Sequence, residues 1–375
     1  MREKIRPAWV EVNMEKAVHN FSEVRRAIGP NVKICAVVKA DSYGMGASEL
    51  SKMYIKNDVY MFAVAVISEA LDLRKEIRDK DILILGYTPE EFFDDAINNN
   101  ITLSIYNYNS AEKLNTAAKK INKKAKIHIM VETGMNRLGF SPTEENADKV
   151  AAIAKMENIN IEGSFSHLAK ADEKDKTSAH KQAEKFISFM NMLEKRNVKI
   201  PIKHIANSAT IIDMPKYYFD MVRPGIILSG FYPSDKVNKQ TYKFEICVTL
   251  KARVANVKTI QPGEGVSYGH LFKATKPTVV GTIPLGYADG YSRLLSNKGY
   301  IIVKGVKCPI LGKICMDQFM ADLSQVDNPQ IGDEAIIYGD GTDGAMTAED
   351  VANMRNTISY EVLTNLSKRL PRKYL

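Results

Sequence analysis

The stretch KICAVVKADSYGMG, residues 33–46, is the starting point for assigning the fold. Its first half is an apolar run typical of a buried strand, and the run ends at Lys39, before a glycine-bearing loop and a helix-like segment from about Ala47. Proteins built on parallel strands place their chemistry at the C-terminal strand ends, where burial lowers the pKa of an amine. Lys39 is therefore a candidate nucleophile, although an ordinary lysine at the rim of a sheet fits the same pattern.

Seven further apolar segments follow, and helix-like segments alternate with them. The eight expected strands start at Lys33, Met61, Asp81, Ile101, Lys126, Ile159, Pro201 and Tyr218. Eight short strands that alternate with helices over about 220 residues favour a closed (β/α)8 barrel of the TIM type over an open sheet.

The pattern changes beyond Ser234, where strand-like segments separated by glycine-rich turns replace the alternation. We therefore expect an α/β protein with two domains, a barrel over residues 1–240 and a mostly β domain over residues 241–375. Residues 1–12 contain the strand-like AWVEV, which either belongs to the barrel domain or adds a strand to the second domain.

Composition excludes several classes of function. The chain has 375 residues, 45% of them hydrophobic and 26% charged, with a formal charge of +8, and its lysines are interspersed with acidic residues rather than set between aromatic ones. We expect no nucleic-acid partner and no metal. The sequence has no leader-like apolar segment and no apolar run of about 18 residues, so we expect neither export nor a membrane partner. Four cysteines without a C-x-x-C pair predict buried free thiols and a cytoplasmic location.

Polar residues and glycines gather directly after the expected strands. They are Lys39 and Tyr43 after the first strand, Glu132, Thr133, Gly134, Met135 and Arg137 after the fifth, His167 after the sixth, Asn207 and Ser208 after the seventh, and Arg223 and Gly225 after the eighth. In a barrel these positions share one rim. Each alone has an ordinary interpretation, such as a helix N-cap or a surface ion pair. Together they suit pyridoxal phosphate, because hydroxyls and N–H groups hold a phosphate while an amine engages the carbonyl.

Nine short motifs extend this interpretation to the whole chain. They are AVVKADSYGMG, VETGMNRLGF, SFSHLAKAD, HIANSA, MVRPGI, VSYGH, GYADGY, KICMDQ and TISYE. In order and approximate spacing they resemble those of the pyridoxal-phosphate-dependent alanine racemases, which are fold type III enzymes. The resemblance implies a barrel followed by a β domain, and a homodimer whose two active sites each lie between the barrel of one subunit and the β domain of the other. It also implies interconversion of L- and D-alanine for peptidoglycan synthesis.

The resemblance assigns two catalytic bases. Lys39 matches the lysine that forms the Schiff base with the cofactor, and Tyr268 in VSYGH matches the second base, which the partner subunit donates. Racemisation needs such a pair, because a proton must leave one face of a planar intermediate and return on the other. His167 and Arg223 resemble the relay that eases deprotonation of the tyrosine. Arg223 also resembles the residue that bonds the pyridine nitrogen of the cofactor.

The same resemblance assigns the binding residues. The remaining cofactor contacts that it implies are Tyr43, Leu85, Asn207, Ser208, Gly225, Ile226 and Tyr360. Arg137 and the backbone of Met316 of the partner subunit resemble the pair that binds the substrate carboxylate. Tyr287 and Tyr360 are expected to narrow the entrance and so to favour a small side chain.

The sequence departs from the family pattern at two places. Many members carry a carbamylated lysine that orients the carboxylate-binding arginine, and this chain has Met130 there, followed by Glu132 where aspartate is common. We expect no carbamylated lysine, so that Arg137 is supported by a bound anion or by a neighbouring polar side chain. Met45 stands where histidine is frequent, with a consequence that the sequence leaves open.

Two alternatives to an alanine racemase stay open at the level of sequence. A racemase with a broader substrate range, including serine or basic amino acids, would share all these motifs. A non-catalytic carrier of pyridoxal phosphate would share the strand end at Lys39 but would lack the β domain and its tyrosine, so Tyr268 argues against it.

Overall fold

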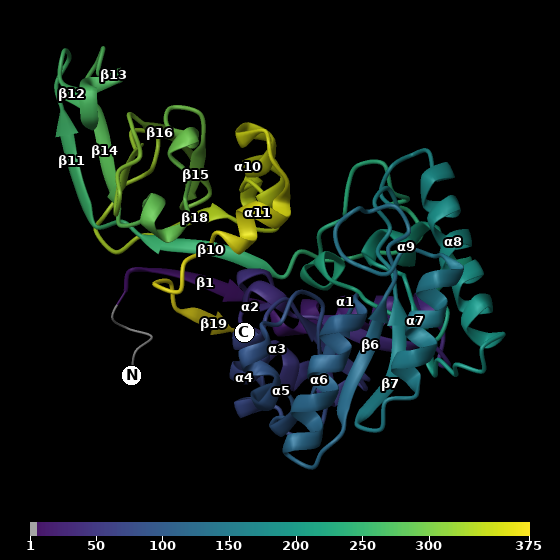
Figure 1. Ribbon diagram of the computed structural model, residues 1–375. Helices are drawn as coiled ribbons and strands as arrows, with labels where there is room; N and C mark the ends of the chain where they lie inside the picture. The colour runs from purple at the N-terminus through teal and green to yellow at the C-terminus, as the bar shows by residue number, and fades with distance from the viewer. Residues whose placement is uncertain (1–5) are drawn as a thin grey trace.

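A ring of eight parallel strands and a separate nine-stranded sheet form the framework of the computed structural model, which describes residues 6–375 (Figure 1). The strands of the ring are β2 (Lys33–Val37), β3 (Met61–Val64), β4 (Asp81–Ile84), β5 (Ile101–Ile105), β6 (Ala125–Met130), β7 (Ile159–Phe165), β8 (Ile202–His204) and β9 (Met221–Val222). Their starts agree with the predicted ones to within one residue, except that β9 begins at Met221 rather than Tyr218. The difference arises because residues 215–217 form a turn of 3₁₀ helix.

Backbone hydrogen bonds bring the two ends of this row of strands together. Neighbouring strands pair in parallel from β8 through β2, and β2 pairs with β9. The N–H of Asp220 then donates to the carbonyl of Lys203 at 3.1 Å, and the N–H of Arg223 donates to the carbonyl of Ala206 at 2.8 Å. These bonds join β9 to the segment of β8, so the predicted (β/α)8 barrel is confirmed.

Helices surround the barrel strands, as Figure 1 shows. They are α1 (Met14–Ile28), α2 (Lys39–Gly44), α3 (Ala47–Lys56), α4 (Ile67–Glu76), α5 (Phe93–Asn98), α6 (Tyr108–Lys120), α7 (Glu144–Ala154), α8 (Thr177–Glu194) and α9 (Ser208–Asp213). Several begin at a polar N-cap, as where the Asn13 side chain accepts from the N–H of Lys16 at 2.9 Å. The buried faces of these helices pack on strands such as β5, all five residues of which are buried.

The second domain is built on the nine-stranded sheet. Its strands are β1 (Ala8–Val12), β10 (Val248–Arg253), β11 (Asn256–Ile260), β14 (Thr278–Ile283), β15 (Tyr300–Val303), β16 (Val306–Leu311), β17 (Phe319–Asp322), β18 (Glu334–Tyr338) and β19 (Arg372–Tyr374). A small hairpin of β12 (Gly265–Val266) and β13 (Phe272–Lys273) extends from it, and α10 (Ala348–Arg355) and α11 (Ser359–Thr364) pack beside it (Figure 1).

The start of the chain is part of this second sheet. Strand β1 pairs antiparallel with β10 and parallel with β19, so AWVEV adds a strand to the C-terminal domain and not to the barrel. The rest of the segment assigned to residues 1–12 includes residues 1–5, which lie outside the described residues.

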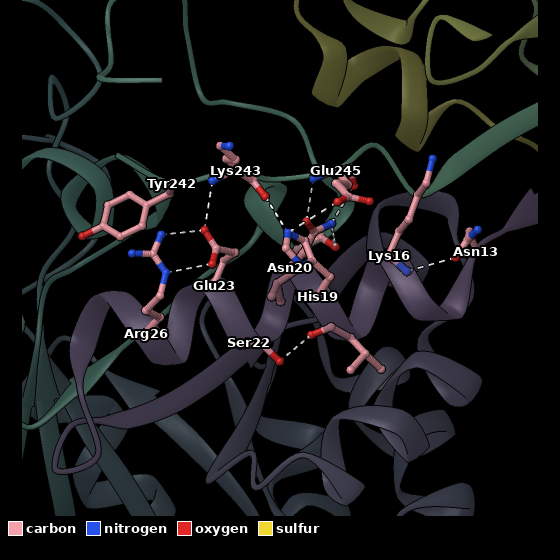
Figure 2. A network of polar contacts seen from close by, with 12 residues as sticks. Asn13, Lys16, His19, Asn20, Ser22, Glu23, Arg26, Tyr242, Lys243 and Glu245 are labelled. Carbon is pink, nitrogen blue, oxygen red and sulfur yellow. Dashed lines mark hydrogen bonds and ion pairs between the residues drawn. The ribbon is translucent and has the colours of Figure 1, made fainter. Parts of the chain in front are cut away.

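Helix α1 holds the segment that connects the two domains (Figure 2). The buried side chain of Asn20 donates to the carbonyls of Glu245 at 2.8 Å and Leu228 at 3.3 Å, and it accepts from the N–H of Glu245 at 2.7 Å. The carboxylate of Glu23 accepts from the N–H of Lys243 at 2.9 Å. The connecting segment therefore has fixed partners on the barrel and is not a free linker.

Two further findings concern the described part of the chain. No helix in residues 6–375 has both the length and the apolar character needed to cross a bilayer. The four cysteines are free, as predicted, and all but the partly exposed Cys315 are buried.

Candidate active site

A cavity of about 480 Å³ opens at the C-terminal ends of the barrel strands. The residues predicted to contact a cofactor all line it, together with Arg137. They are Lys39, Tyr43, Leu85, His167, Asn207, Ser208, Arg223, Gly225, Ile226 and Tyr360. The structure thus brings together residues from the barrel strand ends and their loops with Tyr360 of α11 in the second domain.

Lys39 lies at the start of α2, which is a left-handed turn and not a right-handed helix, at a place where the sequence predicted a loop. Residues 40–43 all have positive φ, between 51° and 56°, a conformation that costs about 1–2 kcal/mol per residue for L-amino acids. The carboxylate of Glu69 offsets part of this cost, since it accepts from the N–H of Ala40 at 2.7 Å and from the N–H of Ala65 at 2.8 Å. Glu69 is a residue that the sequence analysis missed.

The C-terminal segment holds the other end of this turn. Arg372 donates to the carbonyl of Gly44 at 3.0 Å, and the hydroxyl of Tyr374 donates to the carbonyl of Met45 at 3.2 Å. The turn is therefore anchored by α4 on one side and by β19 on the other, so the backbone that carries Lys39 has little freedom.

The surroundings of Lys39 favour its neutral amine. Burial lowers the pKa of Lys39, the positive charges of Arg137 and Arg223 lower it further, and the carboxylate of Glu69 opposes the shift in part. A lowered pKa increases the fraction of amine that can attack a carbonyl or accept a proton.

One end of the cavity is lined by hydroxyl groups and backbone N–H groups. Ser208 accepts from the N–H of Gly225 at 3.0 Å, and a Cβ on Gly225 would lie 2.4 Å from the hydroxyl of Tyr43, so only glycine fits. The rings of Tyr43 and Tyr360 meet edge to face with centroids 6.0 Å apart. Burial raises the pKa of both tyrosines, which therefore stay protonated. These neutral donors suit a phosphate group.

Arg223 occupies the centre of a buried polar network. One of its terminal nitrogens donates to Nδ1 of His204 at 2.7 Å and to the carbonyl of His204 at 2.9 Å. The other donates to the carbonyl of Ser166 at 2.8 Å and lies 3.5 Å from Nδ1 of His167. Burial lowers the pKa of Arg223 to about 10, so it remains protonated at neutral pH.

The donors of Arg223 fix the tautomers of two histidines that the sequence analysis missed. A guanidinium only donates, so Nδ1 of His204 accepts and its Nε2–H donates to Nδ1 of His128, 2.8 Å away. Burial and the charge of Arg223 lower the pKa of His128 to about 3, and they lower that of His204 well below the usual range. Both rings are therefore neutral. The signal that could have identified them in the sequence is a histidine within a predicted barrel strand, at His128 in β6 and at His204 in β8.

His167 is also neutral at physiological pH. Burial lowers its pKa to about 3, and the positive charges of Arg223, Arg137 and Lys39 contribute to the shift. Because Nδ1 of His167 faces the donor Arg223, the neutral ring carries its proton on Nε2 and can donate a hydrogen bond to an oxygen that approaches the cavity wall.

Three predicted site residues lie outside the cavity of this chain. Tyr268, Met316 and Tyr287 all belong to the second domain, and their exposed fractions are 67%, 53% and 43%. Backbone and side-chain bonds hold their segments together, because Tyr287 donates its N–H to Cys315 at 3.1 Å and Ser267 donates its hydroxyl to Lys313 at 2.5 Å. The structure thus collects these residues on an exposed surface of the second domain and not beside Lys39.

Two family models cover almost all of the chain. The alanine racemase N-terminal domain matches residues 12–233, and the alanine racemase C-terminal domain matches residues 247–374. The chain belongs to the alanine racemase family. It is therefore a racemase, an enzyme of the isomerase class, and the predicted family and fold are confirmed.

Members of the alanine racemase family are similar to this chain over its full length. Alanine racemase 1 of Clostridium acetobutylicum is 44% identical over 371 residues, which cover 99% of this chain and 96% of the relative. The alanine racemase of Clostridium tetani is 44% identical over 376 residues, which cover 100% of this chain and 97% of the relative.

Solved structures of the family share the fold. The alanine racemase structure of Clostridium difficile 630 has a TM-score of 0.95 at 39% identity and covers 98% of this chain and 96% of its own. The alanine racemase of D-cycloserine-producing Streptomyces lavendulae has a TM-score of 0.92 at 32% identity, covering 100% of this chain and 98% of its own.

The structure gives a physical setting for the two departures from the alanine racemase pattern. Met130 is buried, and Met45 packs in the core with its sulfur 3.7 Å from that of Cys247. The carboxylate of Glu132 accepts from the backbone N–H of Gly134 and, at 3.1 Å, of Arg137. Burial raises the pKa of Glu132, but hydrogen bonds from the N–H groups of residues 134–137 outweigh this and lower it. In residues 6–375 no group of three or more side chains is arranged to hold a metal ion.

Proposed function

We propose that the protein interconverts L-alanine and D-alanine with pyridoxal phosphate as its cofactor, and with Lys39 and Tyr268 as the two bases. The observation that carries this proposal is the convergence of the expected cofactor residues around one cavity with the amine of Lys39 in its wall. The cofactor, when bound, supplies an electron-withdrawing ring that makes the α proton of the amino acid acidic.

The cavity fits this cofactor at both of its polar ends. The hydroxyls of Tyr43 and Ser208 present neutral donors that would hold a phosphate, and Gly225 positions the Ser208 oxygen by donating its N–H to it at 3.0 Å. Arg223 would face the ring nitrogen, where a guanidinium can donate a hydrogen bond but gives up no proton. Arg223 would thereby leave that nitrogen unprotonated, which would limit the electron demand of the ring and disfavour side reactions such as transamination. His204 fixes the position of Arg223 by accepting from it at 2.7 Å.

Lys39 and Arg137 would act on the substrate from this chain. The lowered pKa of Lys39 makes a neutral amine available to take up the α proton on one face. The guanidinium of Arg137 lines the same cavity and has no side-chain hydrogen bond to the described residues, so it is free to bind a carboxylate.

The second base would come from another copy of the chain. Tyr268 is 67% exposed and does not line the cavity of its own chain, and Tyr287 and Met316 lie on the same domain. We propose a homodimer in which Tyr268 of the partner subunit approaches the opposite face of the substrate. The ordinary pKa of tyrosine is about 10. Nδ1 of His167 faces Arg223, so the Nε2–H of His167 would donate to the tyrosine oxygen and ease its deprotonation. Tyr287 of the partner subunit, with Tyr360, would narrow the entrance and favour a small side chain.

The cellular role follows from the reaction. We propose that the enzyme acts in the cytoplasm and supplies D-alanine for peptidoglycan synthesis. Support for this role comes from the family to which the chain belongs and from the free cysteines.

A racemisation assay on the purified holoenzyme tests the proposal, with L-alanine, L-serine and L-lysine as substrates. We expect turnover of alanine well above that of the other two. Equal turnover of alanine and lysine would contradict the narrow substrate range. Bound cofactor without any racemisation would favour a carrier protein instead.

The variant Tyr268→Phe tests the second base. It removes one hydroxyl from an exposed residue, so we expect normal folding and the normal absorbance of the bound cofactor. Racemisation from at least one enantiomer should fall by about a thousandfold or more, because one face of the substrate loses its base. Unchanged racemisation would contradict the two-base assignment.

A further inference from the structure

Gln182 on α8 is a buried polar residue beneath the cavity wall, with an exposed fraction of 3%. Its side-chain oxygen accepts from the N–H of Ala169 at 2.8 Å, and its nitrogen donates to the carbonyl of His167 at 3.2 Å and to the hydroxyl of Thr133 at 3.4 Å. A backbone N–H only donates and a carbonyl only accepts, so these partners fix the orientation of the amide. The Gln182 side chain thus bonds the segments that follow β6 and β7.

A second buried bond links the same two segments. The hydroxyls of Thr133 and Ser166 lie 2.7 Å apart, and both residues are buried. The carbonyl of Ser166 accepts from Arg223 at 2.8 Å. A continuous set of hydrogen bonds therefore runs from Gln182 through Thr133 and Ser166 to Arg223.

The backbone of the segment after β6 also fits closely over Gln182. Gly134 has a φ of +143°, and a Cβ at this position would lie 3.2 Å from Cγ of Gln182. A side chain at residue 134 would therefore both strain the backbone and press on the glutamine. The glycine of the VETG motif is where the loop rests on α8.

The two segments differ in how they are otherwise held. The segment after β7 is held by the bond of Arg223 to the carbonyl of Ser166, and Arg223 is itself held by His204 of β8. The loop of residues 132–139 carries Arg137, whose guanidinium has no side-chain hydrogen bond within residues 6–375, and the carboxylate of Glu132 bonds to the backbone of that same loop. Loss of the Gln182 amide would remove two bonds to the segment of His167, which Arg223 would still hold at Ser166. It would also remove the bond to Thr133, and the loop of Arg137 would then keep the bond between Thr133 and Ser166 and the bond from Glu132 N–H to the carbonyl of Phe140 at its base.

We propose that Gln182, acting through Thr133, is a positioning residue for Arg137, and that this pair supports the arginine in a chain that has methionine at position 130. The inference rests on the proposed function, because it takes Arg137 to bind the substrate carboxylate. A guanidinium held in one place binds a carboxylate through two parallel hydrogen bonds, and a loosened loop pays an entropy cost for each binding event.

The test compares the holoenzyme with Gln182→Met, which has a similar volume but no amide. We expect KM for L-alanine and the inhibition constant of propionate, a carboxylate without an amine, to rise by about tenfold. The value of kcat should change by less than about threefold, because Lys39 and Arg223 keep their own contacts. Lys181→Met on the exposed side of α8 is the matched control and should leave all three constants unchanged.

A second variant covers the case in which Gln182→Met does not fold. Thr133→Val keeps the shape of the side chain but removes the hydroxyl, and it should raise KM and the inhibition constant of propionate by several-fold. A lower melting temperature with unchanged KM and propionate inhibition, in either folded variant, would overturn the inference. If the wild-type protein does not racemise alanine, the proposed function fails instead, and propionate binding still reports on the link between Gln182 and Arg137.

Discussion

The barrel cavity and the surface of the second domain that carries Tyr268 differ in how far their side chains are buried and held by contacts within the chain. Arg223 is buried and held by hydrogen bonds to His204 and Ser166. The surroundings of Arg223, Lys39 and His167 within this chain lower the pKa of all three. Tyr268 and Met316 are mostly exposed. The pKa and hydrogen bonds of a buried group are set by its own chain, whereas those of an exposed group depend on what binds to it.

Within its own chain the second domain contributes Tyr360 to the cavity and the bond from Arg372 to Gly44. The exposure of Tyr268 and Met316 fits the proposal that these two residues act on the site of a second copy.

The largest effects are expected from the loss of one base in each region, Lys39 in the barrel or Tyr268 in the second domain. Lys39→Ala and Tyr268→Phe should each lose nearly all racemisation as pure homodimers. When the two inactive variants are mixed and allowed to exchange subunits, one site of each mixed dimer has both bases intact. Random exchange should then restore about a quarter of wild-type activity, since half of the dimers are mixed and half of their sites are complete.

The control for this experiment is a mixture of Lys39→Ala with the double variant, in which no complete site can form. Differently tagged chains would show by co-purification that exchange has occurred. Exchange without any recovery of activity would mean that both bases come from one chain.

A smaller effect is expected at Glu69, which supports the barrel side of the comparison. Glu69→Gln keeps one acceptor for the two N–H groups and removes the negative charge that raises the pKa of Lys39. The pKa of Lys39 should fall further, so the pH profile for recombination of the apoprotein with pyridoxal phosphate should shift to lower pH. We also expect a loss of about 1–3 kcal/mol of unfolding free energy.

Absorbance of the recombined cofactor measures this profile. Asp72→Asn on the same helix removes an exposed carboxylate and should leave the profile in place. A shift of the Glu69→Gln profile to higher pH would contradict the electrostatic role of Glu69.

The connection between the two regions should be sensitive to Asn20. Asn20→Ala removes three hydrogen bonds and leaves the N–H of Glu245 and two carbonyls without their partner. We expect a loss of about 1–3 kcal/mol in the free energy of unfolding, measured by denaturant titration. Ser22→Ala, on the exposed face of the same helix, should cost far less. Equal losses of unfolding free energy in Asn20→Ala and Ser22→Ala would show that the bonds of Asn20 to the connecting segment do not add to stability.

The smallest effect at neutral pH concerns the neutral histidines inside the barrel. An unfolded histidine binds a proton near its ordinary pKa of about 6.5, whereas folded His128 binds one only near 3. The unfolded state therefore holds more protons between these values, and the protein loses stability as the pH falls through this window. His128→Asn should make the slope of unfolding free energy against pH shallower by about 1.4 kcal/mol per pH unit in this window.

Acid unfolding curves of the wild-type protein and of His128→Asn measure this slope. His19→Asn, which replaces a partly exposed histidine on α1, is the control for the loss of an imidazole outside the barrel interior. An unaltered slope in His128→Asn would show that His128 is protonated in the native state.

The parts of the fold that were predicted depend on local signals. An apolar run that ends in polar residues marks a strand and its rim, and this pattern located all eight barrel strands as well as Lys39, His167 and Arg223. The β-rich character of the second domain was equally local.

The parts that were missed depend on contacts between distant segments. The left-handed turn after Lys39 is stable because Glu69 and Arg372 bond to it, and neither is near it in sequence. His204 and His128 acquire a role only when Arg223 lies beside them. Gln182 resembles any glutamine on an amphipathic helix until the loops above it are placed.

The bond from Arg372 of β19 to the turn after Lys39 also affects when this turn can form during translation. Arg372 bonds to the carbonyl of Gly44 across 328 positions of sequence, and the edge strand that contains it pairs with β1. A ribosome releases the turn of Lys39 early, but that turn can acquire this bond only after the region near residue 372 has been translated. The reactive lysine should therefore reach its final geometry late, when both domains already exist, so that a nascent barrel does not present a completed site.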